Sequence, residues 1–374
     1  MVTIEEYIRS CKKELEPYID KYLADLIEKR DFSGSASELA ELYEIFKEAG
    51  RGGKCIRGSL VKLGYEIALG RTTEETAEEA EKILPACAAF EVLQTAILGH
   101  DDVIDKSPLR RGKNSIWRAV MLGMEARRME RHSRNALGPF DDFHYGVSQA
   151  ICLGDVGISL ANRLIIESTF DADRKIEAMK TFLNIQLNTV DGEMLDVLMS
   201  HNKEYGDEEG ILKIANLKTA WYTIIGPLQL GAVLGGASGE LLDAMRRYGI
   251  SLGSAFQLRD DILGINATEA EIGKSNTSDI AEGKVTLLAY HAMKVATPAQ
   301  LEQLLRIYGC GTVSEADRLI VCDIFESTGA FAEVTKKAAV YLTEATDIVS
   351  ELTQNAEQTS LLTQLIDMMV QRRS

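Results

Sequence analysis

The sequence has few residues that interrupt helices or cross-link a chain. Six prolines and six cysteines occur in 374 residues. Because proline ends or kinks helices, its scarcity permits long helical segments. The cysteines form no CxxC pair and have no zinc-site spacing, so we expect reduced thiols, mostly core filler, in a cytosolic protein. They are Cys11, Cys55, Cys87, Cys152, Cys310 and Cys322.

Positive charge is also in short supply. The chain has 41 Lys and Arg against 57 Asp and Glu, a net charge of -16. This balance argues against a nucleic-acid partner, because binding a phosphate backbone needs a basic face. The first residues have no basic region before an apolar stretch, so no signal peptide is expected. No run of 18 apolar residues free of charge occurs, so no membrane span is expected, and we predict a cytoplasmic protein.

What the chain does have is hydrophobic residues (45%) at helical spacing. We expect one all-α domain, 1–374, whose helices pack as a bundle around a central cavity. The expected helices cover 2–30, 54–69, 73–104, 144–166, 173–199, 206–234, 238–263, 285–295, 298–308, 314–327, 330–352 and 358–371. A break or kink is expected near Pro85 and a kink at Pro227. Residues 107–112 are expected to form a loop, and 121–136 a solvated helix or mobile lid.

Two aspartate-rich segments are the most informative features of the chain. Asp101-Asp102-Val103-Ile104-Asp105 and Asp260-Asp261-Ile262-Leu263-Gly264 each follow an apolar helical run. Carboxylates four residues apart share one helix face, which favours a cation between them. A solvated acidic patch is the alternative for one such motif, but two motifs after apolar helices argue against it. Oxygen ligands without His or Cys suit Mg²⁺, which bridges carboxylates to phosphates.

Several basic elements accompany the two motifs. Lys54 and Arg57 lie one turn apart at an expected helix N-terminus, a favourable place for an anion. Arg110 and Arg111 follow the first motif, and Lys274 and Lys284 follow the second. Lys218 interrupts an apolar run, where a lysine needs an anionic partner. Each could be ordinary surface charge, but together they suit two diphosphate groups.

These motifs together resemble the trans-isoprenyl diphosphate synthases, the polyprenyl synthetase family. The resemblance rests on the ordered segments GGKCIR, LQTAILGHDDVIDKSPLRRG, LKT, FQLRDDILG and GKSNTSDIAEGKVTL. It implies an α-helical enzyme, a homodimer, that condenses isopentenyl diphosphate with an allylic diphosphate. Carbon–oxygen bond ionisation assisted by Mg²⁺ would precede the condensation, so no histidine base is required.

The resemblance also implies a role for individual residues. Asp101, Asp105 and Asp260 would bind three Mg²⁺ ions on the allylic diphosphate, supported by Asp102 and Asp261. Arg110, Lys218 and Lys274 would clamp that diphosphate, and Lys54, Arg57, Gln94 and Arg111 would hold isopentenyl diphosphate. Thr219 and Gln257 would line the reaction centre, and Lys284 and Asp196 would face the metal side. Terminal Arg372 and Arg373 resemble a basic tail over the isopentenyl site in some members.

The departures from the family pattern are few. Gly264 stands where the second motif usually has its last aspartate, and Glu193 replaces a usual glutamine. Cys55 replaces a frequent arginine and Gly58 a frequent proline. We expect modest effects, because the first aspartate of each motif remains.

Two residues before the first motif are expected to set product length. In the family, bulky aromatics four and five residues before this motif stop growth early. Ile97 and Ala96 occupy these positions here. Non-aromatic residues favour a product longer than farnesyl diphosphate: geranylgeranyl diphosphate first, and the C25 product second. Alternatively, both are ordinary core residues and the floor lies on another helix.

Two rival functions share the helical fold. A class I terpene cyclase would have a different second metal motif and no need for Lys54 and Arg57. A regulatory subunit of a synthase would generally have lost one acidic motif. The sequence therefore favours an active synthase.

Overall fold

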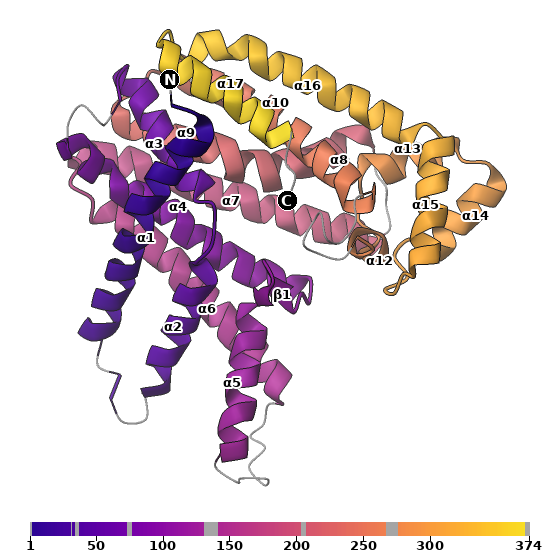
Figure 1. Cartoon of the computed structure of the whole chain (residues 1–374), viewed down its shortest axis with the longest axis horizontal. Coiled ribbons are helices and arrows are strands. Elements are labelled where there is room, and N and C mark those ends of the chain that lie inside the picture. The colour runs from indigo at the N-terminus through magenta and orange to yellow at the C-terminus, as the bar shows by residue number, and fades with distance from the viewer. Residues whose placement is uncertain are drawn as a thin grey trace. The chain divides into compact units, whose positions relative to one another are not determined.

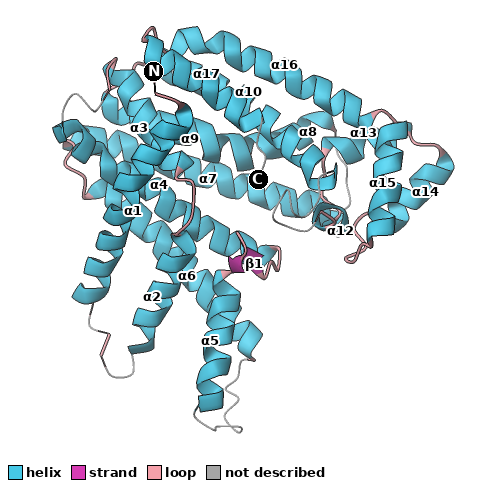
Figure 2. Ribbon diagram, in the orientation of Figure 1, coloured by secondary structure: helices cyan, strands magenta, loops and turns pink. Residues whose placement is uncertain are grey.

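The computed structural model of the chain describes residues 2–30, 32–33, 37–72, 77–130, 141–202, 207–266 and 276–370. Nearly all of the described secondary structure is helical, which confirms the all-α prediction (Figure 2). The chain forms two compact units. The N-terminal unit consists of Glu5–Tyr65 and Thr72–Met179, and the C-terminal unit of Met1–Ile4, Glu66–Arg71 and Lys180–Ser374. The expectation of a single domain over 1–374 stays a prediction.

The elements of the N-terminal unit carry the first aspartate-rich motif (Figure 1). They are α1 (Ile4–Lys29), α2 (Ser37–Gly50), α3 (Ile56–Leu69), α4 (Ala77–Ile104), β1 (Leu109–Arg110), β2 (Lys113–Asn114), α5 (Ile116–Glu130) and α6 (Asp142–Ile166). Helix α4 packs along α6, and α5 packs on α6 as well. This packing is close because α6 has glycines at the contact: a Cβ on Gly154 would lie 2.1 Å from the His100 Nε2 atom.

Two helices of this unit are apolar and long enough to cross a membrane by length and composition. They are Glu78–Ile104 and Asp142–Ile166, whose apolar windows are 67% and 44% buried inside the protein. Burial against neighbouring helices is what core helices of a folded domain show, and such helices pass the same test. Helices α4 and α6 pack along each other, and length and composition alone do not distinguish such helices from membrane spans.

A two-stranded hairpin follows α4. Leu109 pairs with Asn114 and Arg110 with Lys113, in antiparallel register. The two residues of the turn, Arg111 and Gly112, have positive φ angles of 52° and 73°, as a two-residue hairpin turn of type I′ requires. The turn therefore fixes the directions of the two arginines that the sequence analysis singled out.

The elements of the C-terminal unit carry the second motif (Figure 1). They are most of α7 (Ala172–Asn202), then α8 (Glu208–Ile214), the π-helix η3 (Ala215–Ile225), α9 (Gly226–Gly235), α10 (Gly239–Asn266), α12 (Ser278–Glu282), α13 (Leu287–Val295), α14 (Pro298–Ile307), α15 (Glu315–Ser327), α16 (Ala330–Leu352) and α17 (Ala356–Val370).

Helix α10 is the central element of this unit. It packs along α16 and η3, and a Cβ on its Gly253 would lie 2.4 Å from the Cβ of Ala220 in η3. The C-terminal end of α10 is held by Arg318 of α15, whose guanidinium donates to the Ile265 carbonyl at 2.6 Å and to Glu315 at 2.5 Å. The helix that carries the second motif is therefore fixed along its side and at its end.

The helices expected from the sequence are present with shifted ends, the short helix α12 was not expected, and four further details differ. Helix α4 continues through Pro85 without a break. Helix α2 was not anticipated, and the loop expected at 107–112 contains the start of the hairpin. The helix expected at 206–234 is an α-helix, a π-helix and a second α-helix, with Pro227 in the first turn of the last. Residues 121–130 are the helical end of α5, whereas 131–136 lie outside the described residues.

Candidate active site

The first aspartate-rich motif lies at the C-terminal end of α4. Helix α4 ends at Ile104, and the Asp105 amide still donates to the Asp101 carbonyl at 2.8 Å. Asp101 is half-buried, Asp102 is buried and Asp105 is exposed. The helical hydrogen bond keeps Asp101 and Asp105 one turn apart, as the spacing predicted.

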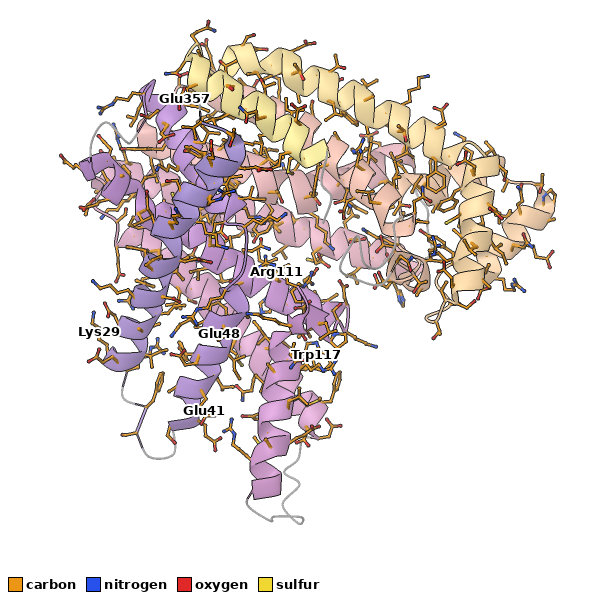
Figure 3. The ribbon with its side chains drawn as sticks, in the orientation of Figure 1. Lys29, Glu41, Glu48, Arg111, Trp117 and Glu357 are labelled. Carbon is orange, nitrogen blue, oxygen red and sulfur yellow. The ribbon has the colours of Figure 1, made fainter. Side chains whose placement is uncertain are left out.

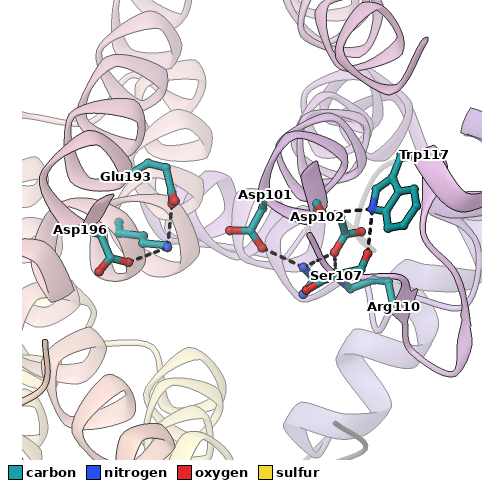
Figure 4. Close-up of polar contacts among 8 residues, drawn as sticks. Asp101, Asp102, Ser107, Arg110, Trp117, Glu193 and Asp196 are labelled. Carbon is teal, nitrogen blue, oxygen red and sulfur yellow. Dashed lines mark hydrogen bonds and ion pairs between the residues drawn. The ribbon is translucent and has the colours of Figure 1, made fainter. Parts of the chain in front are cut away.

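Arg110 of the hairpin pairs with the motif (Figure 4). Its guanidinium donates to Asp101 Oδ2 at 2.8 Å and to Asp102 Oδ1 at 2.8 and 2.5 Å. Burial raises the pKa of Asp102, while Arg110 opposes that shift. The Trp117 indole donates to the carbonyls of Asp102 and Ser107 at 3.2 and 2.9 Å, which ties the motif to α5.

A cavity of about 350 Å³ opens beside these groups, between α2, α4, the hairpin and α5. Its lining includes Gln94, Asp102, Arg110 and Arg111. The Gln94 Oε1 and Ser115 Oγ atoms are buried and, among the described residues, have no hydrogen-bond partner. Buried polar atoms of this kind call for a partner, and a polar group in this cavity could supply one.

The loop before α3 lies next to this cavity. Arg111 packs over its backbone, because a Cβ on Gly53 would lie 3.0 Å from an Arg111 guanidinium nitrogen (Figure 3 labels Arg111). Lys54 is exposed, and Arg57 lies in the first turn of α3, half-buried. The arrangement brings the cations expected to hold isopentenyl diphosphate into one unit with Gln94.

The sequence analysis missed Glu91. Its carboxylate accepts a hydrogen bond from the Gly58 amide at 2.8 Å and lines the cavity. Desolvation raises its pKa, although the Gly58 hydrogen bond and the charges of Arg57 and Arg111 oppose the shift. Glu91 could have been identified from the sequence as a lone glutamate in the apolar run before the motif, because a charge buried away from water needs partners.

The second motif lies near the end of α10. Asp260 is half-buried and Asp261 is buried. The side chains form a continuous chain of contacts: Thr219 Oγ1 donates to Gln257 Oε1 at 2.7 Å, Gln257 Nε2 donates to Asp261 Oδ1 at 2.8 Å, and Lys284 Nζ reaches the same oxygen at 3.3 Å. Gln257 and Lys284 thus meet at the Asp261 carboxylate, and Thr219 is joined to it through Gln257.

Charge inside this network is balanced by ion pairing. Burial raises the pKa of Asp261, against the lowering effect of Lys284. Burial alone would lower the pKa of Lys284, but Asp279 and Asp261 raise it well above its ordinary value. Lys284 is therefore a cation, held between two buried carboxylates.

Lys218 has the anionic partners that its apolar surroundings required (Figure 4 labels both partners). Its ammonium lies 2.7 Å from Glu193 Oε2 and 2.8 Å from Asp196 Oδ2, both on α7. It stands in the π-helix η3, and α7 approaches closely at Gly192, where a Cβ would lie 2.5 Å from the Lys218 amide. π-helical segments occur often at functional sites.

Six of the expected residues line one small cavity of about 60 Å³ in the C-terminal unit. These residues are Asp196, Lys218, Thr219, Gln257, Asp261 and Lys284, which come from α7, η3, α10 and the start of the segment before α13. Lys274, Arg372 and Arg373 lie outside the described residues.

The two expected chain-length residues differ in their surroundings. Ala96 is fully buried, and a Cβ on Gly157 of α6 would lie 2.7 Å from the Ala96 Cβ and 2.5 Å from the ring of Phe46. Ile97 is half-buried and lies four residues before Asp101, on the same helix face. Ile97 is therefore the residue aligned with the aspartates, whereas Ala96 is buried beside Gly157 of α6.

The donor set fits Mg²⁺. In the part of the chain that the structure describes, no three acidic, histidine or cysteine side chains group closely enough to hold a metal. The carboxylates occur as pairs, and Mg²⁺ is usually bound by one or two carboxylates with waters and substrate phosphates rather than by a full protein cage. Asp101 and Asp105 in one unit, and Asp260 in the other, offer such oxygens.

Comparison with known proteins gives a consistent result. The family model described as polyprenyl synthetase matches residues 39–322. A short chain isoprenyl diphosphate synthase of Methanothermobacter thermautotrophicus is 31% identical over 279 residues, 75% of this chain and 74% of the relative. A geranylfarnesyl diphosphate synthase of Aeropyrum pernix is 28% identical over 325 residues, 86% of this chain and 91% of the relative.

A solved structure is similar over the full length. It is a geranylgeranyl pyrophosphate synthase from Corynebacterium glutamicum complexed with isoprenyl diphosphate and magnesium, with a TM-score of 0.85, 27% identity and 100% coverage of both chains. The family match spans both aspartate-rich motifs and most of the chain. The chain therefore belongs to the polyprenyl synthetase family, and it is a prenyltransferase of the isoprenyl diphosphate synthase class.

Proposed function

We propose that the protein condenses isopentenyl diphosphate with an allylic diphosphate and that geranylgeranyl diphosphate is its main product. The observation that carries the proposal is the cavity in which Lys218, Thr219, Gln257, Asp261 and Lys284 converge. Such convergence of cations, a carboxylate and hydrogen-bonding groups suits a substrate that changes charge during the reaction.

The allylic substrate is assigned to the aspartates and their neighbouring cations. Asp101, Asp105 and Asp260 would hold Mg²⁺ on its diphosphate, three ions in the arrangement that the resemblance implies, with Asp102 and Asp261 in support. Arg110, Lys218 and Lys274 would contact the same diphosphate. In support, Arg110 and Lys218 each pair with two carboxylates, so both are cations placed beside acidic groups.

Isopentenyl diphosphate is assigned to the cavity of the N-terminal unit. Arg111 supplies charge at its lining, and the unpartnered Gln94 oxygen lies in the same lining. Lys54 and Arg57 precede and begin α3, where helix amides favour an anion. The apolar lining residues Ile45, Leu98 and Ile116 suit a short hydrocarbon.

The reaction follows from these roles. Bound Mg²⁺ would supply electrostatic stabilisation of the departing diphosphate. Lys218, Arg110 and Lys284 add fixed positive charge as the carbon–oxygen bond of the allylic substrate breaks. The double bond of isopentenyl diphosphate then attacks the allylic cation, a carbon–carbon bond forms, and a proton passes to the departed diphosphate. Thr219 and Gln257, already hydrogen-bonded at 2.7 Å, present oxygen atoms to the developing positive charge.

Product length is assigned to the helix face below the first motif. Ile97 lies one turn before Asp101, so a growing chain that extends from the metal side along this face meets its side chain. An aliphatic side chain leaves more depth than an aromatic ring. This reasoning supports a C20 product, with the C25 or the C15 product as the alternatives.

We also propose that the enzyme is a homodimer in the cytoplasm. All six cysteines are free thiols, in keeping with a reducing compartment. One side of α7 in the C-terminal unit exposes apolar side chains at helical spacing, which a second copy would cover. They are Leu183, Leu187, Val190, Met194, Val197 and Leu198.

The first prediction tests the metal motifs. Asp101→Asn and Asp260→Asn should each lower kcat about tenfold to a hundredfold, because a neutral amide binds Mg²⁺ poorly and one charged contact is worth about 1.5–3 kcal/mol. Steady-state turnover over a range of Mg²⁺ concentrations measures this effect. Asp323→Asn, an exposed residue of α15, is the matched control and should behave as wild type. Wild-type turnover in either motif variant would contradict the metal assignment.

The second prediction separates the two substrates. Arg111→Asn should raise KM for isopentenyl diphosphate about tenfold to a hundredfold, because a charge-assisted contact is lost while asparagine tolerates the positive φ of the turn. Lys218→Met should raise KM mainly for the allylic substrate. The control is Lys106→Asn, since Lys106 is exposed and also has a positive φ, 53°. Equal effects of Arg111→Asn and Lys218→Met on both substrates would refute the separate sites.

The third prediction concerns product length. Ile97→Phe should shift the product toward farnesyl diphosphate, and Ile97→Ala toward C25, as chromatography of the dephosphorylated products would report. Ile97→Leu, which conserves volume, should leave the distribution unchanged. Ala96→Phe should instead lower the stability of the protein by about 1–3 kcal/mol, because it overpacks a closed contact. A product spectrum indifferent to Ile97 would place the floor elsewhere.

The fourth prediction tests the dimer. Met194→Glu and Leu187→Glu should each convert the dimer to a monomer of 41.2 kDa, because a charge would be buried at the interface. Sedimentation equilibrium measures the mass. Leu305→Glu on α14 is the control, since Leu305 is 58% exposed against 62% for Leu187 and 66% for Met194. A wild-type monomer, or dimers in both α7 variants, would argue against this interface.

A further inference from the structure

The cavity of the N-terminal unit is lined by a buried serine whose hydroxyl group is unused. Ser115 is 2% exposed and lies in the cavity lining. Its Oγ atom has no hydrogen-bond partner among the described residues. A buried hydroxyl without a partner costs free energy in the ligand-free protein. A polar group that enters the cavity and bonds to it would remove this cost.

The backbone on both sides fixes the position of Ser115. Its amide donates to the Pro108 carbonyl at 3.0 Å, and its carbonyl accepts from the Ala119 amide at 2.9 Å. Helix α5 begins at Ile116, so Ser115 stands at the N-terminus of this helix. A serine at this position usually caps the helix by accepting a hydrogen bond from a first-turn amide. The Ser115 hydroxyl makes no such contact with the described amides, so it remains available to a ligand.

The surroundings of Ser115 favour an anion as its partner. The first amides of an α-helix have no partner within the helix, and the first turn of α5 contains no acidic side chain. The positive end of the helix dipole therefore lies beside Ile116, which also lines the cavity. Arg111 and Lys113, in the hairpin before Ser115, line the same cavity.

The carboxylates of the cavity lining already have partners within the protein. Asp102 pairs with Arg110, Glu48 with Arg51 and Glu44 with Lys47, and Glu91 accepts the Gly58 amide at 2.8 Å. These contacts weaken the repulsion that the acidic residues would exert on an anion in the cavity.

We propose that the Ser115 hydroxyl donates a hydrogen bond to the diphosphate of isopentenyl diphosphate, beside the first turn of α5. The residues assigned above to this substrate do not include Ser115. Gln94, which is among them, is 8% exposed, and its Oε1 atom has no hydrogen-bond partner among the described residues either. One bound diphosphate would satisfy both side chains, because an amide group can turn to present its NH₂ to an anion. This inference rests on the function proposed above.

The test combines substrate binding with the stability of the ligand-free protein. Ser115→Ala should weaken the binding of isopentenyl diphosphate about tenfold, because a hydrogen bond to a charged group is lost. Titration calorimetry without the allylic substrate measures this affinity, since no turnover occurs. KM for the allylic diphosphate should not change. The Tm of the ligand-free variant should equal or exceed that of wild type, because the removed hydroxyl has no bond to lose.

Two further variants and a control complete the design. Ser115→Cys keeps nearly the same side-chain size but has only a weak donor, so it should also lose affinity, whereas Ser115→Thr keeps the hydroxyl and should bind as wild type. The control is Ser314→Ala. The Ser314 hydroxyl caps α15, donating to Asp317 Oδ2 at 2.6 Å and accepting from the Asp317 amide at 3.2 Å. Its loss should lower Tm and leave the binding of isopentenyl diphosphate unchanged.

The outcomes that overturn the inference differ from the one that overturns the proposed function. If wild type binds isopentenyl diphosphate and Ser115→Ala binds it equally well, Ser115 is not a ligand residue and the proposed function stands. A fall in Tm for Ser115→Ala like that of Ser314→Ala would show that the hydroxyl has a structural partner, which also refutes the inference. If wild type does not bind isopentenyl diphosphate, the proposed function fails and the inference fails with it.

Discussion

Carboxylates held away from water beside fixed cations are the constraint on which the candidate active site depends. A buried aspartate is costly unless a cation or hydrogen bonds compensate it. Asp102 is compensated by Arg110 and Asp261 by Lys284. Each compensation fixes a local structure: the hairpin that presents Arg110, and the segment after α12 that presents Lys284. The electrostatic requirement thus explains why the hairpin and the segment after α12 each present a cation to a motif.

Many of the local features of the candidate site could be predicted from the sequence, because they depend on residue type and on regular spacing along a helix. The spacing of Asp101 and Asp105 predicted a shared helix face, and the helical hydrogen bond between them bears this out. Lys218 in an apolar run predicted an anionic partner, and Glu193 and Asp196 provide two. Both inferences use local geometry or the cost of burying charge, which do not depend on the rest of the fold.

Other features could not be predicted, because they depend on contacts between distant segments. Ala96 and Ile97 are neighbours in sequence, yet Ala96 is fully buried beside Gly157 of α6, whereas Ile97 is half-buried. Asp279 of α12 lies so close to Gly264 of α10 that an added Cβ would be 2.9 Å from its Oδ2 atom, and no local rule connects these two positions. Three non-glycine residues with positive φ, Cys55, Lys106 and Arg111, adjoin the candidate phosphate-binding segments. Such backbone strain, about 1–3 kcal/mol at each residue, is typical of functional sites. It cannot be predicted from the amino-acid composition.

The π-helix η3 has a consequence for comparing this chain with its relatives. Its hydrogen bonds join residues i and i+5, whereas those of an α-helix join i and i+4. A π-helical turn therefore contains more residues than an α-helical turn. Residues before and after Ala215–Ile225 are therefore out of phase with those of a regular helix. An alignment to a relative with an unbroken α-helix must place a gap within this segment. Without that gap, Lys218 or the residues that follow it would be matched to positions on the wrong face of the helix.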